Sequence, residues 1–423
     1  MTARNRELLN LLVVGMLTAL GFASVYVARQ AEISTESLSY AGFFVGLYLV
    51  AHVVARFTVP YADPYLLPMA ALLTAIGVTE IYRLDPDDAL RQGMWVVIGV
   101  GFFSATLVVL RRDYRRLEAY RYLFGVGAIV LLVLPALPFI GLTVNGARLW
   151  VRLGPFQFQP GEVAKLMLIV FLAGYLREKR EVLAQGRLKD FGPLLAIWGG
   201  AMLVLVQTND LGSALLYFGI FLGMLYVATG RAIFAAAGLA LFVAGSYVLY
   251  QLVPRVQQRV AVWLDPWAEK EEAGYQIVQS TFSIGNGGFG GTGLGRGTFA
   301  TIGGDRIIPF LNTDFIYAAI AQELGLIGAS ALLLVYMLFV VRGFRTALLA
   351  GDGFSKLLAA GLTFGFALQT FIILGGVLRL IPLTGITLPF VSYGGSSVLA
   401  NFVLLAGLLL VSNRATALGE RPR

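Results

Sequence analysis

Long apolar runs alternate with short polar segments along almost the whole chain. They recur about twelve times, and each is close to the roughly 20 residues with which an α-helix crosses a bilayer. We expect membrane-spanning helices at 8–28, 39–58, 66–83, 92–110, 120–142, 161–177, 191–206, 212–229, 232–252, 314–341, 356–378 and 390–412. The pattern predicts an all-α integral membrane protein, a polytopic bundle with one large polar loop at 253–313.

Composition agrees with a membrane protein and excludes several kinds of site. The chain is 58% hydrophobic and only 13% charged, whereas a soluble chain is about a quarter charged. It has no cysteine, which excludes disulfides, thiol nucleophiles and cysteine-bound metals. The single histidine, His52, lies in an apolar run, so we interpret it as a packed or interfacial residue and not as a base. The first apolar run follows a basic start, but its length and the many later spans predict a retained helix.

Basic residues gather in short segments between spans, which sets the orientation. One cluster runs from Arg111 to Arg121, and two others comprise Arg177, Lys179, Arg180, Arg187 and Lys189, then Arg342, Arg345 and Lys356. Because cytoplasmic loops are enriched in Lys and Arg, we expect both termini in the cytoplasm. The loops at 143–160, 207–211, 253–313 and 379–389 then face outward. The net charge of +8 is thus a topology signal, and we expect no nucleic-acid partner.

An outward loop at 145–165, NGARLWVRLGPFQFQPGEVAK, leads into the sixth span. Pro160 suits the first turn of a helix, and Glu162 and Lys165 share one helix face. A charge in the membrane costs about 2.5–3.5 kcal/mol, so these two are either a structural ion pair or groups facing a polar cavity. Arg148 and Arg152 are either snorkelling interfacial residues or ligand-binding ones.

Three further outward segments carry polar or small residues. In QTNDLG, Asp210 precedes a span, which favours a helix N-cap. The run IGNGGFGGTGLGRG at 284–297 lacks the GK[ST] of a nucleotide-binding loop; it forms either flexible turns or backbone that approaches a ligand closely. In VSYGGSS, Ser396 and Ser397 either offer hydroxyl and N–H groups to an anion or form a packing surface.

Trp263 and Trp267 are expected to anchor the large loop at the lipid headgroups.

Asp314 opens the tenth span, in NTDFIYAAIAQELGLIG. Small residues follow it on one helix face, at Ala318, Ala321, Gly325 and Gly328. Such stripes let helices approach closely in lipid, so Asp314 should face the bundle at its outer end. Glu323 lies about 180° around the helix and shares that site only if the helix is broken. Asp314 could instead only complement the helix dipole.

These features converge on one side of the membrane. Spans beginning near Pro160, Asp314 and Pro389 point their positive dipole ends to the same outer face. With Arg148, Arg152 and Lys165 nearby, that face could hold an anionic, diphosphate-bearing amphiphile. Asp314 is the carboxylate available there as a base.

The same motifs resemble the SEDS family (shape, elongation, division and sporulation), which includes RodA and FtsW. The resemblance covers roughly residues 66–412 and involves GARLW, QPGEVAK, QTNDLG, GYQIVQS, TDFIYAAIAQELGLIG and LPFVSYGGSS, in the family's order. It implies a ten-helix core at 63–413 that contains the loop 253–313, preceded by a helix pair at 1–62 and followed by a cytoplasmic tail at 414–423. The short tails favour the RodA-like branch.

The resemblance also implies an activity and its partners. SEDS proteins are peptidoglycan glycosyltransferases of the bacterial cytoplasmic membrane. They polymerise lipid II, an undecaprenyl-diphosphate-linked disaccharide-pentapeptide, usually beside a class B penicillin-binding protein that acts as transpeptidase. The catalytic aspartate of the family maps onto Asp314. Two substrate-binding motifs map onto Glu162 with Lys165 and onto Arg148 with Trp150.

Three departures from the family pattern stand out. Gly161 replaces a serine, the segment IPFLN at 308–312 lacks a nearby Glu and His, and Gln322 stands where the family usually has a carboxylate. None of them alters Asp314, Glu162 or Lys165.

Our mechanistic hypothesis is an inverting transfer with Asp314 as general base on the acceptor hydroxyl. Lys165, with Arg148 or Arg152, would offset charge on the leaving diphosphate, with a divalent cation (Mg or Mn) as an option. A flippase for the same lipid and a non-enzymatic scaffold for a partner are the alternatives. A transporter needs polar groups accessible from both faces, whereas here they lie on the outer side.

Overall fold

The computed structural model describes residues 2–30, 35–138, 140–144, 147–154, 156–184, 192–299 and 307–419. Arg187, Lys189, part of the large loop and the end of the tail lie outside these ranges. The long helices are α1 (Ala3–Gln30), α2 (Thr35–Thr58), α3 (Leu66–Leu84), α4 (Pro86–Leu110), α6 (Arg121–Val133), α7 (Pro160–Ala184), α8 (Gly192–Gln207), α9 (Leu211–Thr229), α10 (Ala232–Leu252), α13 (Ile316–Leu349), α14 (Gly353–Val377) and α15 (Gly395–Gly419).

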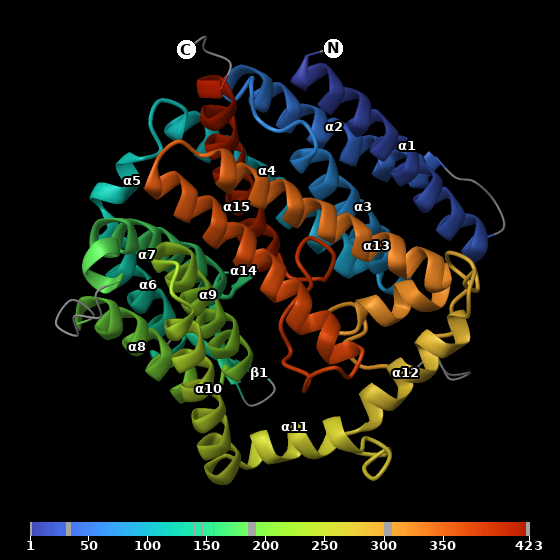
Figure 1. Cartoon of the computed structure of the whole chain (residues 1–423). Helices are drawn as coiled ribbons and strands as arrows, with labels where there is room; N and C mark the ends of the chain where they lie inside the picture. The colour runs from blue at the N-terminus through green and yellow to red at the C-terminus, as the bar shows by residue number, and fades with distance from the viewer. Residues whose placement is uncertain are drawn as a thin grey trace.

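Each of the twelve predicted spans falls on one of these helices. Within the described residues, nine helices are long and apolar enough to cross a membrane, while α6 and α8 are shorter apolar helices. Helix α7 carries a charged end from Arg177 to Glu181. Three shorter elements, α5 (Arg116–Ala119), α11 (Pro254–Leu264) and α12 (Tyr275–Gly287), lie between the spans. Both chain ends lie at the same end of the bundle, and α11 and α12 lie at the opposite end (Figure 1).

The fifth predicted span ends earlier than its apolar pattern suggests. Helix α6 stops at Val133 and passes through η1 (Leu134–Ala136) into a small sheet. Pro135 and Pro138 cannot supply helical N–H groups, which ends the helix. The sheet is antiparallel, in the order β1 (Gly141–Val144), β2 (Ala147–Leu153), β3 (Phe156–Phe158). It is a local addition to a helical bundle and leads directly into α7.

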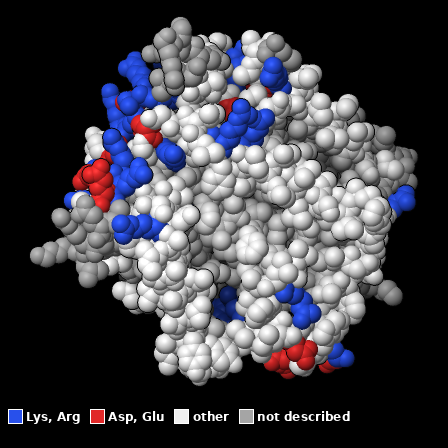
Figure 2. All heavy atoms as spheres, in the orientation of Figure 1, with Lys and Arg blue, Asp and Glu red and all other residues white. Residues whose placement is uncertain are grey.

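Charge is distributed as expected for a membrane protein. In Figure 2, Lys and Arg gather over the upper left of the molecule, and a broad band across the middle carries almost none. The same upper region holds α5 and both chain ends in Figure 1. Helices α15 and α4 pack closely on each other, as do α6 and α7, and α13 and α14. The bundle is therefore held by helix packing across an uncharged belt.

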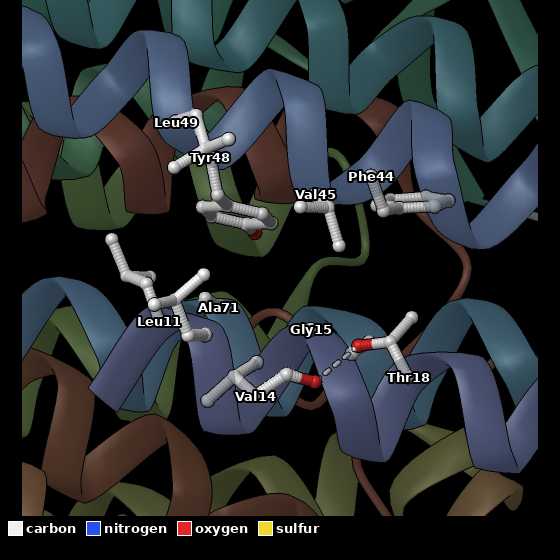
Figure 3. A pocket seen from close by; sticks show the side chains of 11 residues that line it. Leu11, Val14, Gly15, Thr18, Phe44, Val45, Tyr48, Leu49 and Ala71 are labelled. Atoms are coloured by element: carbon white, nitrogen blue, oxygen red, sulfur yellow. Dashed lines mark hydrogen bonds between the residues drawn. The ribbon is translucent and has the colours of Figure 1, made fainter. Parts of the chain in front are cut away.

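The N-terminal pair packs on α3 and α4. Figure 3 shows a close approach within the pair, where Gly15 of α1 faces Val45 of α2. A Cβ added at Gly15 would lie 2.8 Å from Val45 Cγ2, so only glycine allows this approach. Nearby, the buried carboxylate of Glu7 accepts from Arg4 at 2.5 Å and contacts Nδ1 of His52 at 2.7 Å. His52 is thus a packed residue, as expected from its apolar surroundings.

Helix α13 is broken near its start. Gly325 adopts φ 66° and ψ −169°, a conformation open to glycine but not to other residues. The segment from Ile316 to Leu324 is therefore a separate half-helix. Its freed backbone groups bond to the glycine-rich run: Leu326 N donates to Gly288 O at 3.0 Å, and Gly293 N donates to Glu323 O at 2.9 Å. Within this run, Gly287 and Gly291 lie directly against the backbone of the half-helix.

Candidate active site

Helix α7 begins at Pro160 and places two charges on its first turns. Lys165 Nζ donates to Glu162 Oε2 at 2.7 Å and to Gln369 Oε1 of α14 at 2.6 Å. Lys165 is buried, with 3% of its surface exposed, so this pairing offsets its desolvation. The hydroxyl of Tyr217 of α9 donates to the Gly161 carbonyl. The predicted pair forms, and a second helix holds it in place.

The hydrogen bonds continue from Lys165 to the start of α15. Gln369 Nε2 donates to the Thr387 carbonyl at 3.0 Å, and the Thr387 and Ser397 hydroxyls lie 2.8 Å apart. Ser396 Oγ accepts from the Gln159 amide at 2.7 Å. Both serines are buried, with 1% and 4% of their surfaces exposed. Ser396 thus links α15 to the residue just before α7, and Ser397 links α15 to the segment that precedes it. Both hydroxyls serve helix packing, which agrees with the packing interpretation of this motif.

Asp314 lies just before the half-helix and next to the same segment. A Cβ added at Gly385 would lie 3.6 Å from Asp314 Oδ2. Arg259 of α11 interacts electrostatically with Asp314 and with Asp210, and it donates to the Thr384 carbonyl at 3.4 Å. The segment 384–387 therefore connects the Asp314 side of the site with the Lys165 side.

Asp210 caps α9, as its position predicts. Its carboxylate accepts from Ser213 N at 3.0 Å, which satisfies a free N–H group at the helix start. Burial raises the pKa of Asp210, and Glu162 adds to the rise. Asp210 therefore interacts electrostatically both with Glu162 of the Glu162–Lys165 pair and with Arg259.

The carboxyl of Asp314 has a shifted pKa. Burial raises the pKa from its usual 3.8 to about 6, against the opposing effects of Arg259 and the Thr313 hydroxyl. Desolvation disfavours the charged form of a carboxyl. At Asp314 this effect on the pKa is larger than the opposing effect of the Arg259 guanidinium. A carboxyl with a pKa of about 6 is a stronger base than an exposed aspartate and is still mostly ionised at neutral pH.

The segment 388–394 is fixed on the other side by buried polar groups. Ser392 Oγ donates to the Thr313 carbonyl at 2.6 Å, and the Gln92 side chain bonds Ser392 O and Gly394 N. Tyr393 N donates to Asn312 O at 2.9 Å. The backbone just before Asp314 is thus held by the segment that precedes α15, which Gln92 of α4 fixes in turn.

Arg148, Trp150 and Arg152 lie on β2 of the small sheet. Arg148 donates to the Leu137 carbonyl at 2.8 Å, which keeps its guanidinium against the η1 turn, and Trp150 pairs with Leu142. Arg152 is exposed. Within the described chain, neither arginine makes a hydrogen bond or ion pair with the carboxylates of Glu162 or Asp314. The structure does not bring them into that group.

Glu323 is engaged elsewhere. Its carboxylate accepts from Gly295 N at 2.6 Å, Gly297 N at 2.9 Å and Arg83 Nε at 3.2 Å. It is fully buried. Glu323 and Asp314 therefore have separate sites, one in the glycine-rich loop and one beside Arg259.

Sequence reasoning missed Arg259, Gln369 and Thr387. Arg255 and Arg259 stand one helical turn apart in an amphipathic stretch of the large loop, a spacing that could have indicated a cationic helix face. Gln369 is a lone amide in an apolar span, which is itself a signal of a polar site. Thr387 carries no comparable signal, since threonine is common in such segments.

The carboxylates do not assemble a metal centre on their own. Among the described residues, no three Asp, Glu or His side chains group as ligands. Asp210 and Asp314 instead share Arg259, and Glu162 is paired with Lys165. A Mg²⁺ or Mn²⁺ ion would have to take most of its oxygen ligands from a substrate diphosphate and water, as Mg²⁺ often does.

Comparisons with known proteins place this geometry in a family. The model of the cell cycle proteins named for FtsW, RodA and SpoVE matches residues 64–417. The chain belongs to this family. Helices α1 and α2 precede the matched region, which begins six residues after the end of α2 at Thr58.

Relatives within the FtsW/RodA/SpoVE family include curated and solved proteins. The chain is 42% identical to the peptidoglycan glycosyltransferase RodA of Mycobacterium bovis, over 100% of this chain and 93% of the relative. It is 34% identical to the probable peptidoglycan glycosyltransferase FtsW of Geobacter metallireducens, over 83% of this chain and 95% of the relative.

Two solved structures share the fold. One belongs to a peptidoglycan synthase complex that coordinates polymerization and crosslinking, with TM-score 0.71 and 28% identity, over 84% of this chain and 98% of that one. The other is the rod shape determining protein RodA of Thermus thermophilus, with TM-score 0.60 and 25% identity, over 84% and 97%. The shared part is polytopic and membrane-embedded, which agrees with the predicted fold class.

Proposed function

We propose that this chain is a RodA-type peptidoglycan glycosyltransferase that polymerises lipid II at the outer face of the bacterial cytoplasmic membrane. Its curated relatives bear that activity in their names. The observation that carries the residue-level proposal is the environment of Asp314, whose pKa is raised to about 6 beside Arg259.

In the proposed reaction, Asp314 takes the proton of a sugar hydroxyl on the acceptor lipid II. The hydroxyl oxygen forms a bond to the anomeric carbon of the donor chain as the bond from that carbon to the diphosphate oxygen breaks. The diphosphate leaves with the electron pair. One displacement inverts the α-linked donor to a β-linked product, so no covalent enzyme intermediate is required.

The leaving diphosphate needs positive charge. Arg259 interacts electrostatically with Asp314, and Lys165 lies on the same network, so we assign both to the leaving group. Arg148 and Arg152, on the hairpin next to α7, are then placed to meet the headgroup further out. Glu162 holds Lys165, and Asp210 holds the start of α9. A bound divalent cation would supply further neutralisation of the diphosphate.

We propose that both termini lie in the cytoplasm, because the Lys- and Arg-rich end of the bundle carries them (Figure 2). The partner is a class B penicillin-binding protein. One structural relative belongs to a complex that couples polymerization with crosslinking, which supports a transpeptidase at the same membrane face.

A lipid II polymerisation assay on purified protein tests the proposal. Wild type should form glycan strands in detergent, with and without the transpeptidase, and Asp314→Asn should not. Detergent removes the second compartment, so a flippase gives no signal. Asp314→Asn polymer at the wild-type rate would exclude Asp314 as base, while absence of polymer from every form, transpeptidase included, would exclude the enzyme itself.

A further inference from the structure

A second, chemically different site lies between the N-terminal pair and the family core. It is a cavity of about 330 Å³ lined by residues of α1, α2, α3 and α4, among them Phe22, Tyr40, Phe44, Tyr82, Gly93 and Met94. This volume falls in the range of small-ligand pockets. By contrast, the void beside Gly15 (Figure 3) measures about 10 Å³ and is a packing gap. We name the larger space the aromatic crevice.

The aromatic crevice lies inside membrane-spanning segments. Its walls belong to spans Ser39–Thr58, Leu66–Leu84 and Pro86–Leu110. Phe43, Leu90 and Met94 on its rim are about half exposed, at 49%, 50% and 50%. On a membrane-spanning surface that exposure is to hydrocarbon and not to water. The crevice is therefore continuous with the lipid around the protein.

Its lining selects a hydrocarbon chain. Phe22 stacks on Tyr40 at a centroid distance of 6.0 Å and on Phe44 at 6.3 Å, and Tyr82 closes the group at 5.6 Å from Phe22. A space of this size has room for several waters, but water enters only where it finds two to four polar partners. An apolar chain gains instead about 0.8 kcal/mol for each buried CH₂ group.

The charges at the outer end of the crevice select the headgroup. Asp85, Asp87 and Asp88 stand at the start of α4, directly before the crevice residues Ala89 and Leu90. Asp85 caps the helix, and Asp88 bonds Asn312 and Arg91. The Asp87 side chain is exposed and makes no hydrogen bond or ion pair with any described residue. Asp87, the carboxylate of this group that neither caps the helix nor pairs with Arg91, favours an ammonium group and disfavours a doubly charged diphosphate.

We propose that the aromatic crevice holds one acyl chain of a phospholipid whose primary ammonium headgroup lies against Asp87. The site is independent of the proposed lipid II chemistry, and it joins the N-terminal pair to the core through a bound lipid. A polyprenyl diphosphate is a poor occupant, because its headgroup carries no cation to offset the charge of Asp87.

Photo-crosslinking tests the proposal on the full-length chain in nanodiscs. The probes are phosphatidylethanolamine and phosphatidylglycerol, each with a diazirine on one acyl chain, and labelled peptides are mapped by mass spectrometry. Wild type should be labelled by the ethanolamine probe on the crevice segments of α2 and α4, and several-fold less by the glycerol probe. Unlabelled undecaprenyl diphosphate should not compete.

Two glycines of α4 give a matched pair of variants. A Cβ at Gly93 or at Gly101 meets nothing within 4 Å, so both positions are open at the first side-chain atom, but only Gly93 lines the crevice. Gly93→Leu should lower labelling of the crevice about tenfold, and Gly101→Leu should leave it unchanged. Asp87→Asn should remove the preference for the ethanolamine probe and retain labelling.

The proposal fails if folded, monodisperse Gly93→Leu is labelled as strongly as wild type. Equal labelling by the two probes in wild type overturns the headgroup assignment, and efficient competition by undecaprenyl diphosphate overturns the choice of lipid. If Gly93→Leu does not fold, a competition experiment on wild type decides the question. Unlabelled phosphatidylethanolamine should then displace the ethanolamine probe from the crevice more effectively than unlabelled phosphatidylglycerol does, and equal displacement by the two lipids would contradict the proposal.

Discussion

Asp314 and Glu323 are nine residues apart in the sequence and belong to the same segment, yet their surroundings are opposite. Glu323 is fully buried and accepts two glycine N–H groups and one arginine N–H. Asp314 keeps some exposed surface, is influenced by Arg259 at a distance, and has a raised pKa. A carboxylate whose oxygens are all bonded serves structure, whereas one with spare capacity and a raised pKa is available for proton transfer.

The largest expected effect is on the rate of lipid II polymerisation, and it should distinguish Asp314 from Glu323. Asp314→Asn should lower the rate of lipid II polymerisation by about 10²–10⁴-fold, the usual contribution of a general base. The glycan products of purified wild type and variant, separated on a gel, measure it. Glu323→Asp, matched in charge, should lose much less activity per folded molecule, and a comparable loss in both would contradict the division of roles.

For the free energy of unfolding, we expect the opposite order: a substitution at Glu323 should cost more than one at Asp314. Glu323→Gln removes the charge partner of Arg83 and turns an amide NH₂ toward donors, which should cost about 3–5 kcal/mol. Thermal unfolding in detergent, followed by tryptophan fluorescence, gives the comparison.

Asp314→Asn serves as the isosteric control for this loss. The native carboxyl binds its proton more tightly than the unfolded one, so its ionisation lowers stability as pH rises from about 4 to 6. Asn escapes this cost, and the variant should melt at or above the wild-type temperature at pH 7. A lower melting temperature would mean that Asp314 is a structural anchor like Glu323.

The pH profile sharpens the assignment of the base. With a pKa of about 6, the active form of Asp314 is the ionised one. The specificity constant should be level above pH 7 and fall about tenfold for each pH unit well below 6. Initial rates of polymerisation at subsaturating lipid II across pH 4.5–8 test this, with Glu323→Asp as reference. A profile that is flat through pH 6 would contradict the proposal.

The smallest expected effect comes from Arg259. Its positive charge lowers the pKa of Asp314, so Arg259→Gln should move the midpoint of the pH profile upward and weaken leaving-group stabilisation by about tenfold. Arg259→Lys keeps the charge and should retain a midpoint close to that of wild type. An unchanged midpoint in Arg259→Gln would remove Arg259 from the site.

The sequence predicted the helices and one side of the site well, because those rest on local patterns. Apolar runs of bilayer length identified twelve helices, and i,i+3 spacing predicted the Glu162–Lys165 pair, found at 2.7 Å. The N-cap role of Asp210 follows from its place before a span. Each of these features depends on residues within a few positions of one another.

Features that depend on distant pairing were not predictable in the same way. Apart from Gly141 and Leu142, the β1–β2–β3 sheet occupies the predicted outward loop at 143–160, and its strand register is not revealed by apolar runs. Arg259 interacts with Asp314 only because α11 lies across the end of the bundle opposite the chain ends (Figure 1). The break at Gly325 depends on Gly288–Gly293, which supply the backbone partners that the helix loses.

The pairing between the glycine-rich run and α13 has a consequence for how the chain tolerates changes in length. Surface loops usually accept insertions and deletions. Here Thr292 N donates to Gln322 O at 3.0 Å and Ile327 N donates to Phe289 O at 3.2 Å, so one added residue between them would shift donors out of line with acceptors. Length variation in this large loop should fall at the exposed turn 268–273 instead.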